Sequence, residues 1–222
     1  MSIIFQWLLT LLFPPRCVFC LNPMEIESLM PCSRCRDQLS WTQGSGETQH
    51  GRSFSRCVSA AWYEGLIRQS VLRFKFSRHP DYAKAYAPYL AEIIQAKLPN
   101  RFDLITWIPV SQETLARRGY DQARLLAEET ALLLNKPLAS TLVKVRTNAP
   151  QSSLSGLHNR RDNVADIFAL SPEAPLLRGL RVLLMDDIIT TGATLEEGAR
   201  VLLRAGAIEV PAATFCRTRP PS

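Results

Sequence analysis

The stretch RVLLMDDIITTGAT, residues 181–194, decides the fold of this chain. Residues 182–185 form a short, continuous apolar run, which is typical of a strand buried on both faces. Two carboxylates, Asp186 and Asp187, follow this run, so we expect the strand to end at them. A small loop rich in hydroxyl groups comes next, and a helical pattern follows the loop. The stretch therefore predicts a strand, an acidic pair, a loop and the amino end of a helix.

The loop and the start of the helix have the properties of a phosphate site. Thr194, with Glu197 three residues later, has the pattern of a capping box, so we expect the helix to begin there. The amino end of a helix presents unpaired backbone N–H groups and a positive dipole end, which bind a phosphate dianion. Gly192 lets the backbone approach a ligand closely. Hydroxyl donors come from Thr190, Thr191 and Thr194.

Asp186 and Asp187 suit a different part of a ligand. Two adjacent carboxylates repel phosphate, but they accept hydrogen bonds from a pair of sugar hydroxyls. A phosphate on the helix and a diol on the carboxylates together describe a ribose 5-phosphate. An apolar run that ends in two acids also resembles the magnesium strand of P-loop NTPases, but the G-x-x-x-x-G-K-[ST] segment is absent. A solvated strand end without a function is the other alternative.

The segment DDIITTGAT resembles the phosphoribosyl pyrophosphate (PRPP) loop of type I phosphoribosyltransferases. The whole chain is similar to the ComF/GntX family, which joins a small cysteine module to such a domain. Three further segments carry the resemblance: ITWIPV at 105–110, RRGYDQARLLA at 117–127, and the polar run 147–163. The resemblance implies that PRPP is bound by Asp186, Asp187, Thr190, Thr191, Gly192, Ala193 and Thr194.

The same resemblance implies a function. Asp186 and Asp187 would be the catalytic residues, since they would hold the ribose hydroxyls and stabilise developing positive charge. Magnesium would bind with PRPP, mainly through substrate oxygens. The favoured activity is transfer of ribose 5-phosphate to a nitrogen nucleophile with release of pyrophosphate, although no residue stands out as a general base. The alternative is a non-enzymatic sensor of PRPP or a nucleotide that handles single-stranded DNA or meets a DNA-processing protein, because ComF-like proteins are associated with DNA uptake and utilisation.

Basic residues suit an anionic ligand. The net charge is +6 and the isoelectric point is about 9.2. Residues 130–161 contain no acidic residue, which indicates either a solvated basic face or contacts to pyrophosphate. The long polar run 147–163 corresponds by resemblance to a hood that closes over PRPP and excludes water. The candidates for pyrophosphate contacts are Arg117, Arg118, Arg146 and Arg160.

A helix is expected over residues 66–76, where basic and aromatic residues alternate. Such a pattern can bind single-stranded nucleic acid by stacking and charge neutralisation. An amphipathic helix with a solvated basic face explains the pattern more simply, and we favour it. The basic residues concerned are Arg68, Arg73, Lys75 and Arg78.

Two C-x-x-C pairs near the amino terminus predict a metal site. Each pair brings two thiolates to one ion, and two pairs complete a tetrahedral structural zinc site. Two disulfides are the alternative, but they suit secreted proteins, and a redox C-x-x-C is a third possibility. The proposed ligands are Cys17, Cys20, Cys32 and Cys35.

The remaining pattern gives the organisation of the chain. Residues 1–13 are apolar but too short to span a bilayer and lack a cleavage site, so we expect a packed helix, no membrane span and a cytoplasmic protein. Residues 1–40 are expected to form the helix and zinc ribbon, 41–59 a linker, and 60–222 the phosphoribosyltransferase-like domain. Strands alternate with helices in the last part, which predicts an α/β fold with a mostly parallel sheet and helices on both faces.

Overall fold

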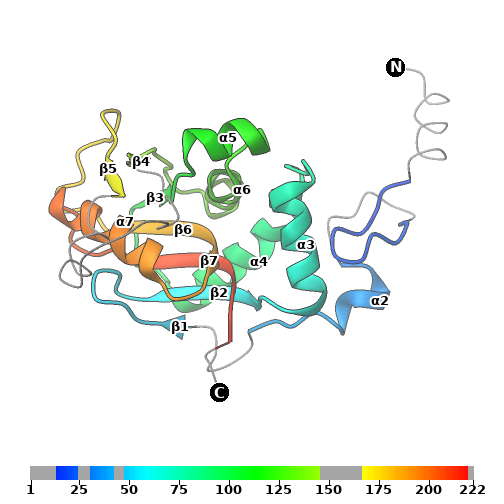
Figure 1. Cartoon of the computed structure of the whole chain (residues 1–222). Coiled ribbons are helices and arrows are strands. Elements are labelled where there is room, and N and C mark those ends of the chain that lie inside the picture. The colour runs from blue at the N-terminus through cyan, green and yellow to red at the C-terminus, as the bar shows by residue number, and fades with distance from the viewer. Residues whose placement is uncertain (1–13, 25–30, 43–47, 146–166, 220–222) are drawn as a thin grey trace, which may run out of the picture.

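The computed structural model describes residues 14–24, 31–42, 48–145 and 167–219. Its centre is a five-stranded sheet with the strand order β1-β2-β7-β6-β3 (Figure 1). Only the short edge strand β1 is antiparallel to its neighbour, and the other pairs are parallel. The α/β fold with a mostly parallel sheet is therefore confirmed. The strands are β1 (Thr48–Gln49), β2 (Cys57–Trp62), β3 (Leu104–Trp107), β6 (Val182–Ile189) and β7 (Ala212–Arg217).

Strand β6 lies inside the sheet, between β7 and β3, and its side chains divide between two hydrophobic cores. Leu183 and Met185 pack in one core, and Val182 and Leu184 pack in the other. This division follows from the strand geometry, since successive side chains point to opposite faces. The continuous apolar run is thus explained by burial on both faces.

Helices cover both faces of the sheet. The first core is formed with α3 (Gly65–Phe76), α4 (Tyr82–Lys97) and α6 (Gln122–Leu134). The second core is formed with α7 (Ala193–Arg204) and with a separate antiparallel pair, β4 (Leu142–Lys144) and β5 (Phe168–Leu170). A shorter helix, α5 (Gln112–Arg118), connects β3 to α6.

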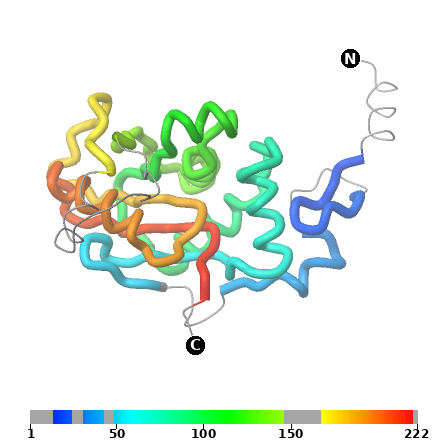
Figure 2. Tube along the Cα trace, in the orientation of Figure 1, coloured from blue at the N-terminus to red at the C-terminus, as the bar shows by residue number. Residues whose placement is uncertain are grey.

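The cysteine segment packs against α3 and α4 and shares the first core. Cys17, Phe19 and Cys35 belong to the same cluster of buried residues as the sheet and helices. Trp41 stacks on Tyr89 of α4, with ring centroids 4.3 Å apart. The tube view shows this segment, with the short helix α2 (Ser33–Arg36), beside α3 at one end of the molecule (Figure 2). Strands β1 and β2 both begin within 41–59, the range expected to be a linker.

Two local expectations for the central stretch were wrong. The strand does not end at Asp186 and Asp187 but continues past them to Ile189, which still pairs with Arg217 of β7. The helix begins at Ala193 rather than Thr194, and its N-cap is Gly192, without a side-chain cap. The capping box is therefore absent.

Some expectations concern residues outside the described part. These are the amino-terminal helix at 1–13, the hood at 147–163, and the candidates Arg146 and Arg160. Among the described residues, no helix has the length and apolar character needed to cross a bilayer.

Candidate functional site

Asp187 lies at the carboxyl end of β6 in an ion pair. Its Oδ2 atom is 3.0 Å from Nζ of Lys75, which belongs to α3. The two side chains are only 12% and 19% exposed, so this pair is largely shielded from water. Shielding strengthens an ion pair relative to an exposed one, because the effective dielectric constant is lower. Asp187 is therefore held by a cation in a defined orientation.

Asp186 lies in a different environment, because adjacent residues of a strand point to opposite faces. Its Oδ1 atom accepts a hydrogen bond of 2.8 Å from the backbone N–H of Asp187. Burial, followed by the charge of Asp187, raises the pKa of Asp186 well above its usual value. The acidic pair is thus asymmetric: Asp187 has a cationic partner, and Asp186 is biased towards its neutral form.

The loop after β6 presents its hydroxyl groups to solvent. Thr190, Thr191 and Thr194 are all exposed, and so is Ala193. Gly192 has φ of 84°, in the left-handed region that favours glycine. A Cβ there would also lie 3.2 Å from Nε2 of Gln49, which is a tight contact. The loop therefore presents the amino end of α7 and three hydroxyl groups on an accessible surface.

The first turn of α7 is fixed by a contact that the sequence did not reveal. Oε2 of Glu196 accepts a hydrogen bond of 2.8 Å from the backbone N–H of Ser53, and its other oxygen accepts one from Arg52. The partners lie in the segment between β1 and β2. Because they are more than 140 residues away in sequence, no local pattern could have predicted this contact.

Of the two adjacent arginines, only Arg118 is partly buried near the acidic pair. Burial lowers the pKa of Arg118, and the charge of Asp187 opposes this shift. Its guanidinium lies 5.0 Å from the ring centroid of Phe76 and donates a hydrogen bond of 2.8 Å to Gln122. Arg117 is exposed. Arg118 is thus half-buried and within electrostatic range of Asp187, whereas Arg117 lies on the surface.

Asp121 is the N-cap of α6. Its Oδ1 atom accepts a hydrogen bond of 3.2 Å from the N–H of Arg124, and Oδ2 accepts one of 3.1 Å from Val110. Burial is the main cause of the raised pKa of Asp121, and the charge of Asp187 adds to it. This side chain ties the loop after β3 to the start of α6.

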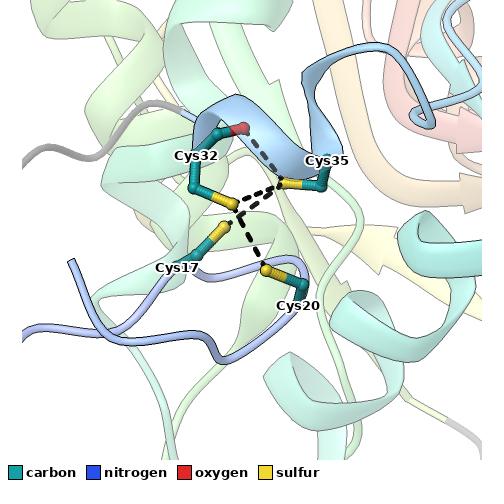
Figure 3. A group of neighbouring side chains, drawn as sticks. All are labelled: Cys17, Cys20, Cys32 and Cys35. Atoms are coloured by element: carbon teal, nitrogen blue, oxygen red, sulfur yellow. Dashed lines mark hydrogen bonds between the residues drawn. The ribbon is translucent and has the colours of Figure 1, made fainter.

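The four cysteines of the two C-x-x-C pairs converge on one point (Figure 3). Their sulfur atoms all lie within 4.8 Å of one another, and the Cys17–Cys35 and Cys20–Cys32 pairs are 3.5 and 3.4 Å apart. A zinc ion with four thiolates at about 2.3 Å requires sulfur atoms about 3.8 Å apart, so the cluster fits this ion. All six cysteines of the chain are free thiols, which argues against the two-disulfide alternative.

The thiols of the cluster differ in acidity. Burial raises the pKa of Cys32, but hydrogen bonds from the Cys35 backbone and from neighbouring thiols outweigh it and lower the value to about 7. Burial raises the pKa of Cys35 and of Cys20. Zinc binds thiolates and releases their protons. Cys32 therefore ionises more readily than Cys20 and Cys35.

The basic residues in and just after α3 do not form a uniform solvated face. Arg68 and Arg78 are exposed, but Arg73 donates hydrogen bonds of 2.9 and 2.7 Å to the carbonyl oxygens of Val18 and Phe19. Lys75 is used in the ion pair with Asp187. Sequence reasoning missed both roles, since helical periodicity does not show which basic residues meet a distant partner.

Comparison with known proteins gives a family match and distant structural neighbours. The family model described as "Phosphoribosyl transferase domain" matches residues 116–221. Among solved structures, the glutamine PRPP amidotransferase from B. subtilis is 20% identical, with a TM-score of 0.45, over 68% of this chain and 31% of that chain. The family match assigns a phosphoribosyl transferase domain to residues 116–221 of the chain.

Two relatives identify the family. The DNA utilization protein YhgH of Salmonella typhimurium is 33% identical over 210 residues, which cover 91% of this chain and 84% of that protein. Competence protein F of Haemophilus influenzae is 29% identical over 218 residues, covering 88% and 93%. The chain therefore belongs to the ComF/YhgH family, as its resemblance to ComF proteins indicated.

Proposed function

We propose that this chain binds PRPP and transfers its ribose 5-phosphate group to a nitrogen nucleophile, with release of pyrophosphate. The observation that carries the proposal is the arrangement at the end of β6. An exposed threonine loop and the amino end of α7 follow directly after two carboxylates. Backbone N–H groups and hydroxyls suit a phosphate, and carboxylates suit a sugar diol. The phosphoribosyltransferase domain match supports the same ligand.

Each part of PRPP has proposed partners. Asp186 and Asp187 bind the ribose hydroxyls, and Arg118 is the best-placed contact for pyrophosphate because it lies near Asp187. Arg117, Arg146 and Arg160 remain further candidates for pyrophosphate. The 5-phosphate is bound by the loop and helix start, Thr190, Thr191, Gly192, Ala193 and Thr194.

The proposed reaction is a substitution at C1 of the ribose. The nitrogen lone pair forms a bond to C1 while the bond from C1 to the pyrophosphate oxygen breaks, and that oxygen keeps the electron pair. The nitrogen then loses its proton to solvent or to the released pyrophosphate. Positive charge grows on the ribose ring as the bond breaks. A carboxylate next to the ring stabilises this charge, and Asp187, which is paired with Lys75 at the end of β6, is the acid suited to do so.

The acidic pair also fits magnesium bound together with PRPP. Carboxylate oxygens suit this ion, which usually takes one or two of them and completes its shell with substrate phosphates and water. Because Asp187 already contacts an ammonium group, the chain supplies few ligands of its own here. When bound, magnesium would neutralise part of the pyrophosphate charge.

We also propose that the four thiolates hold one structural zinc ion. A site with four protein ligands leaves no open position, so this ion would stabilise the fold and take no part in the reaction. The free thiols suit a reducing compartment, and we propose the cytoplasm as the location.

Calorimetry with PRPP and magnesium tests the binding proposal. We expect saturable binding by the wild-type chain and a loss of about tenfold or more in affinity for the double variant Thr190→Val/Thr191→Val, since it removes hydroxyl contacts to a charged group. Thr218→Val, which changes a threonine beyond the end of β7, is the matched control. Failure of the wild-type chain to bind PRPP would remove the proposal.

Pyrophosphate release tests the catalytic part. The intact chain is incubated with PRPP, magnesium and a panel of nitrogenous bases or ammonia. We expect release of pyrophosphate with one acceptor and its absence in Asp187→Asn. Binding of PRPP without release for any acceptor would support a PRPP or nucleotide sensor instead.

A second candidate function is binding of single-stranded DNA. The guanidinium groups of Arg217 and Arg219 lie 5.5 and 4.5 Å from the ring centroid of Trp62, at the carboxyl edge of β2 and β7. Cations beside an aromatic ring suit the phosphates and bases of a single strand. The names of the relatives, with DNA utilization and competence, agree with such a partner. Affinity for an oligonucleotide should fall log-linearly with salt and fall further in Trp62→Ala.

A further inference from the structure

Lys75 lies outside the region that the phosphoribosyl transferase family model matches, residues 116–221, yet it contacts the acidic pair of that domain. The distance from its Nζ atom to Oδ2 of Asp187 is 3.0 Å. An exposed ion pair contributes little, but these side chains are at most 19% exposed. The contact therefore belongs to the site rather than to the surface.

The rest of α3 holds Lys75 in place. Ser70 Oγ donates a hydrogen bond of 2.6 Å to the carbonyl oxygen of Val18, and Arg73 donates to the same oxygen. Near the end of the helix, the hydroxyl of Tyr120 donates to the carbonyl oxygen of Phe74. Phe74, the residue before Lys75, is thus held by a hydrogen bond from the segment that precedes α6. Only the lysine side chain needs to move for its ammonium group to reach another acceptor.

Charged groups from several elements interact with the pair formed by Lys75 and Asp187. Asp187 and Asp186 come from β6, Arg118 comes from the end of α5, and Asp121 precedes α6. The charge of Asp187 acts on Arg118, Asp121 and Asp186, and the charge of Lys75 acts on Asp186. Two cations and three carboxyl groups therefore share one charged cluster at the carboxyl end of β6.

The covalent structure of PRPP explains why a carboxylate and an ammonium group can bind neighbouring parts of the same ligand. In PRPP the pyrophosphate is attached to C1, next to the carbon that carries the 2-hydroxyl. A carboxylate that holds the ribose hydroxyls thus lies beside the pyrophosphate. An ammonium group in contact with that carboxylate is within reach of pyrophosphate oxygens, and it has three donors to share. The positive ammonium group and the negative pyrophosphate would then lie close together, and their opposite charges attract.

From this geometry we infer that Lys75 binds the pyrophosphate group of PRPP. Without ligand it pairs with Asp187, and in the complex it donates hydrogen bonds to pyrophosphate oxygens as well. This inference rests on the proposed function, because it names a further residue of the same site. It makes α3 part of the ligand site, although the helix precedes the family domain in the sequence.

Lys75→Gln is the test, with two ligands compared by calorimetry on the intact chain. PRPP carries the pyrophosphate, and ribose 5-phosphate lacks it but keeps the other groups. We expect Lys75→Gln to bind PRPP about tenfold or more weakly, because a charge-assisted contact is lost, while ribose 5-phosphate affinity changes less than about threefold. Lys84→Gln, which removes an exposed lysine of the adjacent helix α4, should leave both affinities unchanged.

The outcomes separate this inference from the proposed function. If the wild-type chain binds neither ligand, the proposed function fails. If the wild-type chain binds PRPP and Lys75→Gln binds it equally well, or loses both ligands to the same degree, the inference on Lys75 is wrong. Circular dichroism and zinc content establish that Lys75→Gln is folded. Should the unpaired Asp187 unfold it, Lys75→Arg replaces it: this variant keeps the charge and should retain the preference for PRPP over ribose 5-phosphate.

Discussion

The cysteine cluster (Cys17, Cys20, Cys32 and Cys35) and the threonine loop (residues 190–192) differ in their exposure to solvent. In the cluster, Cys17 and Cys35 are each only 1% exposed, and their sulfurs face one another across a closed space. In the loop, Thr190 and Thr191 are exposed, and a left-handed glycine leads into α7. A closed set of ligands retains an ion and stabilises a fold, whereas an open set exchanges a ligand. The difference indicates which site supports structure and which site supports function.

The two sites are nevertheless connected through α3. Ser70 and Arg73 bind the backbone of the segment between Cys17 and Cys20, and Lys75 binds Asp187 two residues further along the helix. The predictions below ask how far damage at one site reaches the other.

The largest effect is expected from Cys35→Ser. This substitution removes a buried thiol of the proposed zinc site, so we expect loss of bound zinc and a fall in the free energy of unfolding of more than about 4 kcal/mol, as is typical for loss of a metal site. Elemental analysis and thermal melting measure both. Cys57→Ala, which changes a buried thiol outside the cluster, should retain zinc. Full zinc content in Cys35→Ser would show that the cluster is not the metal site.

A smaller effect is expected from Arg73→Met. Methionine keeps much of the side-chain packing but loses the hydrogen bonds to Val18 and Phe19, so we expect a loss of about 1–3 kcal/mol and faster zinc release to a chelator. Arg68→Met changes an exposed arginine of the same helix and serves as the control. PRPP affinity should change little. An equal loss of PRPP affinity and zinc would show that the two sites act as one unit.

Asp186→Asn should stabilise the protein at neutral pH. Because the pKa of Asp186 is raised in the folded state, the folded chain binds its proton more tightly than the unfolded chain. The contribution of Asp186 to the free energy of unfolding is therefore fully present below the pKa of the unfolded chain. It is lost as the pH rises through the pKa of the folded chain. The neutral asparagine avoids that loss, and a gain of roughly 1 kcal/mol would raise Tm by about 2–4 °C.

The pH dependence provides the check on this prediction. The difference in Tm between Asp186→Asn and the wild-type chain should shrink as the pH falls towards 4. Asp81→Asn, at an exposed aspartate, should show no such gain. A variant that is less stable than the wild-type chain at neutral pH would mean that ionised Asp186 stabilises the fold.

The smallest effect is expected from Arg181→Gln, at the amino end of β6 and far along the strand from both sites. Arg181 holds Asp103 by two side-chain hydrogen bonds, of 2.7 and 3.0 Å, and these bonds lower the pKa of Asp103 to about 2. Both side chains are about one-third exposed, so we expect a loss of less than about 1 kcal/mol.

This contribution has a defined pH window. Because the folded pKa of Asp103 is lowered, the stabilisation is present above the unfolded pKa of 3.8 and disappears as the pH falls through about 2. The melting curves of Arg181→Gln and the wild-type chain should converge in acid. Zinc content and PRPP affinity should remain those of the wild-type chain, and a change in either would link this end of the sheet to the sites.

Local sequence patterns predicted the parts of the molecule that local forces determine. The apolar run before Asp186 predicted a buried strand, since burial on both faces requires apolar residues throughout. The spacing of the four cysteines predicted their convergence, because each C-x-x-C pair directs two sulfurs to one point. The assignment of the loop residues and acids to PRPP stays a prediction.

Contacts between distant segments explain what the sequence did not reveal. Lys75 and Asp187 are more than a hundred residues apart, so no spacing rule relates them. Strand β6 continues beyond Asp186 and Asp187 because β7 pairs with it as far as Ile189. The apolar pattern of the sequence does not reveal this pairing. The capping box is absent because the N-cap of α7 is Gly192, two residues before the expected Thr194, while Glu197 pairs with Arg200.

A crystal structure of the intact chain with PRPP and magnesium is the most direct test of the ligand site. The account predicts the 5-phosphate within hydrogen-bond distance of the backbone N–H groups at the start of α7 and of the Thr190 and Thr191 hydroxyls, with the ribose hydroxyls on Asp186 and Asp187. PRPP bound at another surface, with this loop and both carboxylates free of it, would contradict the account.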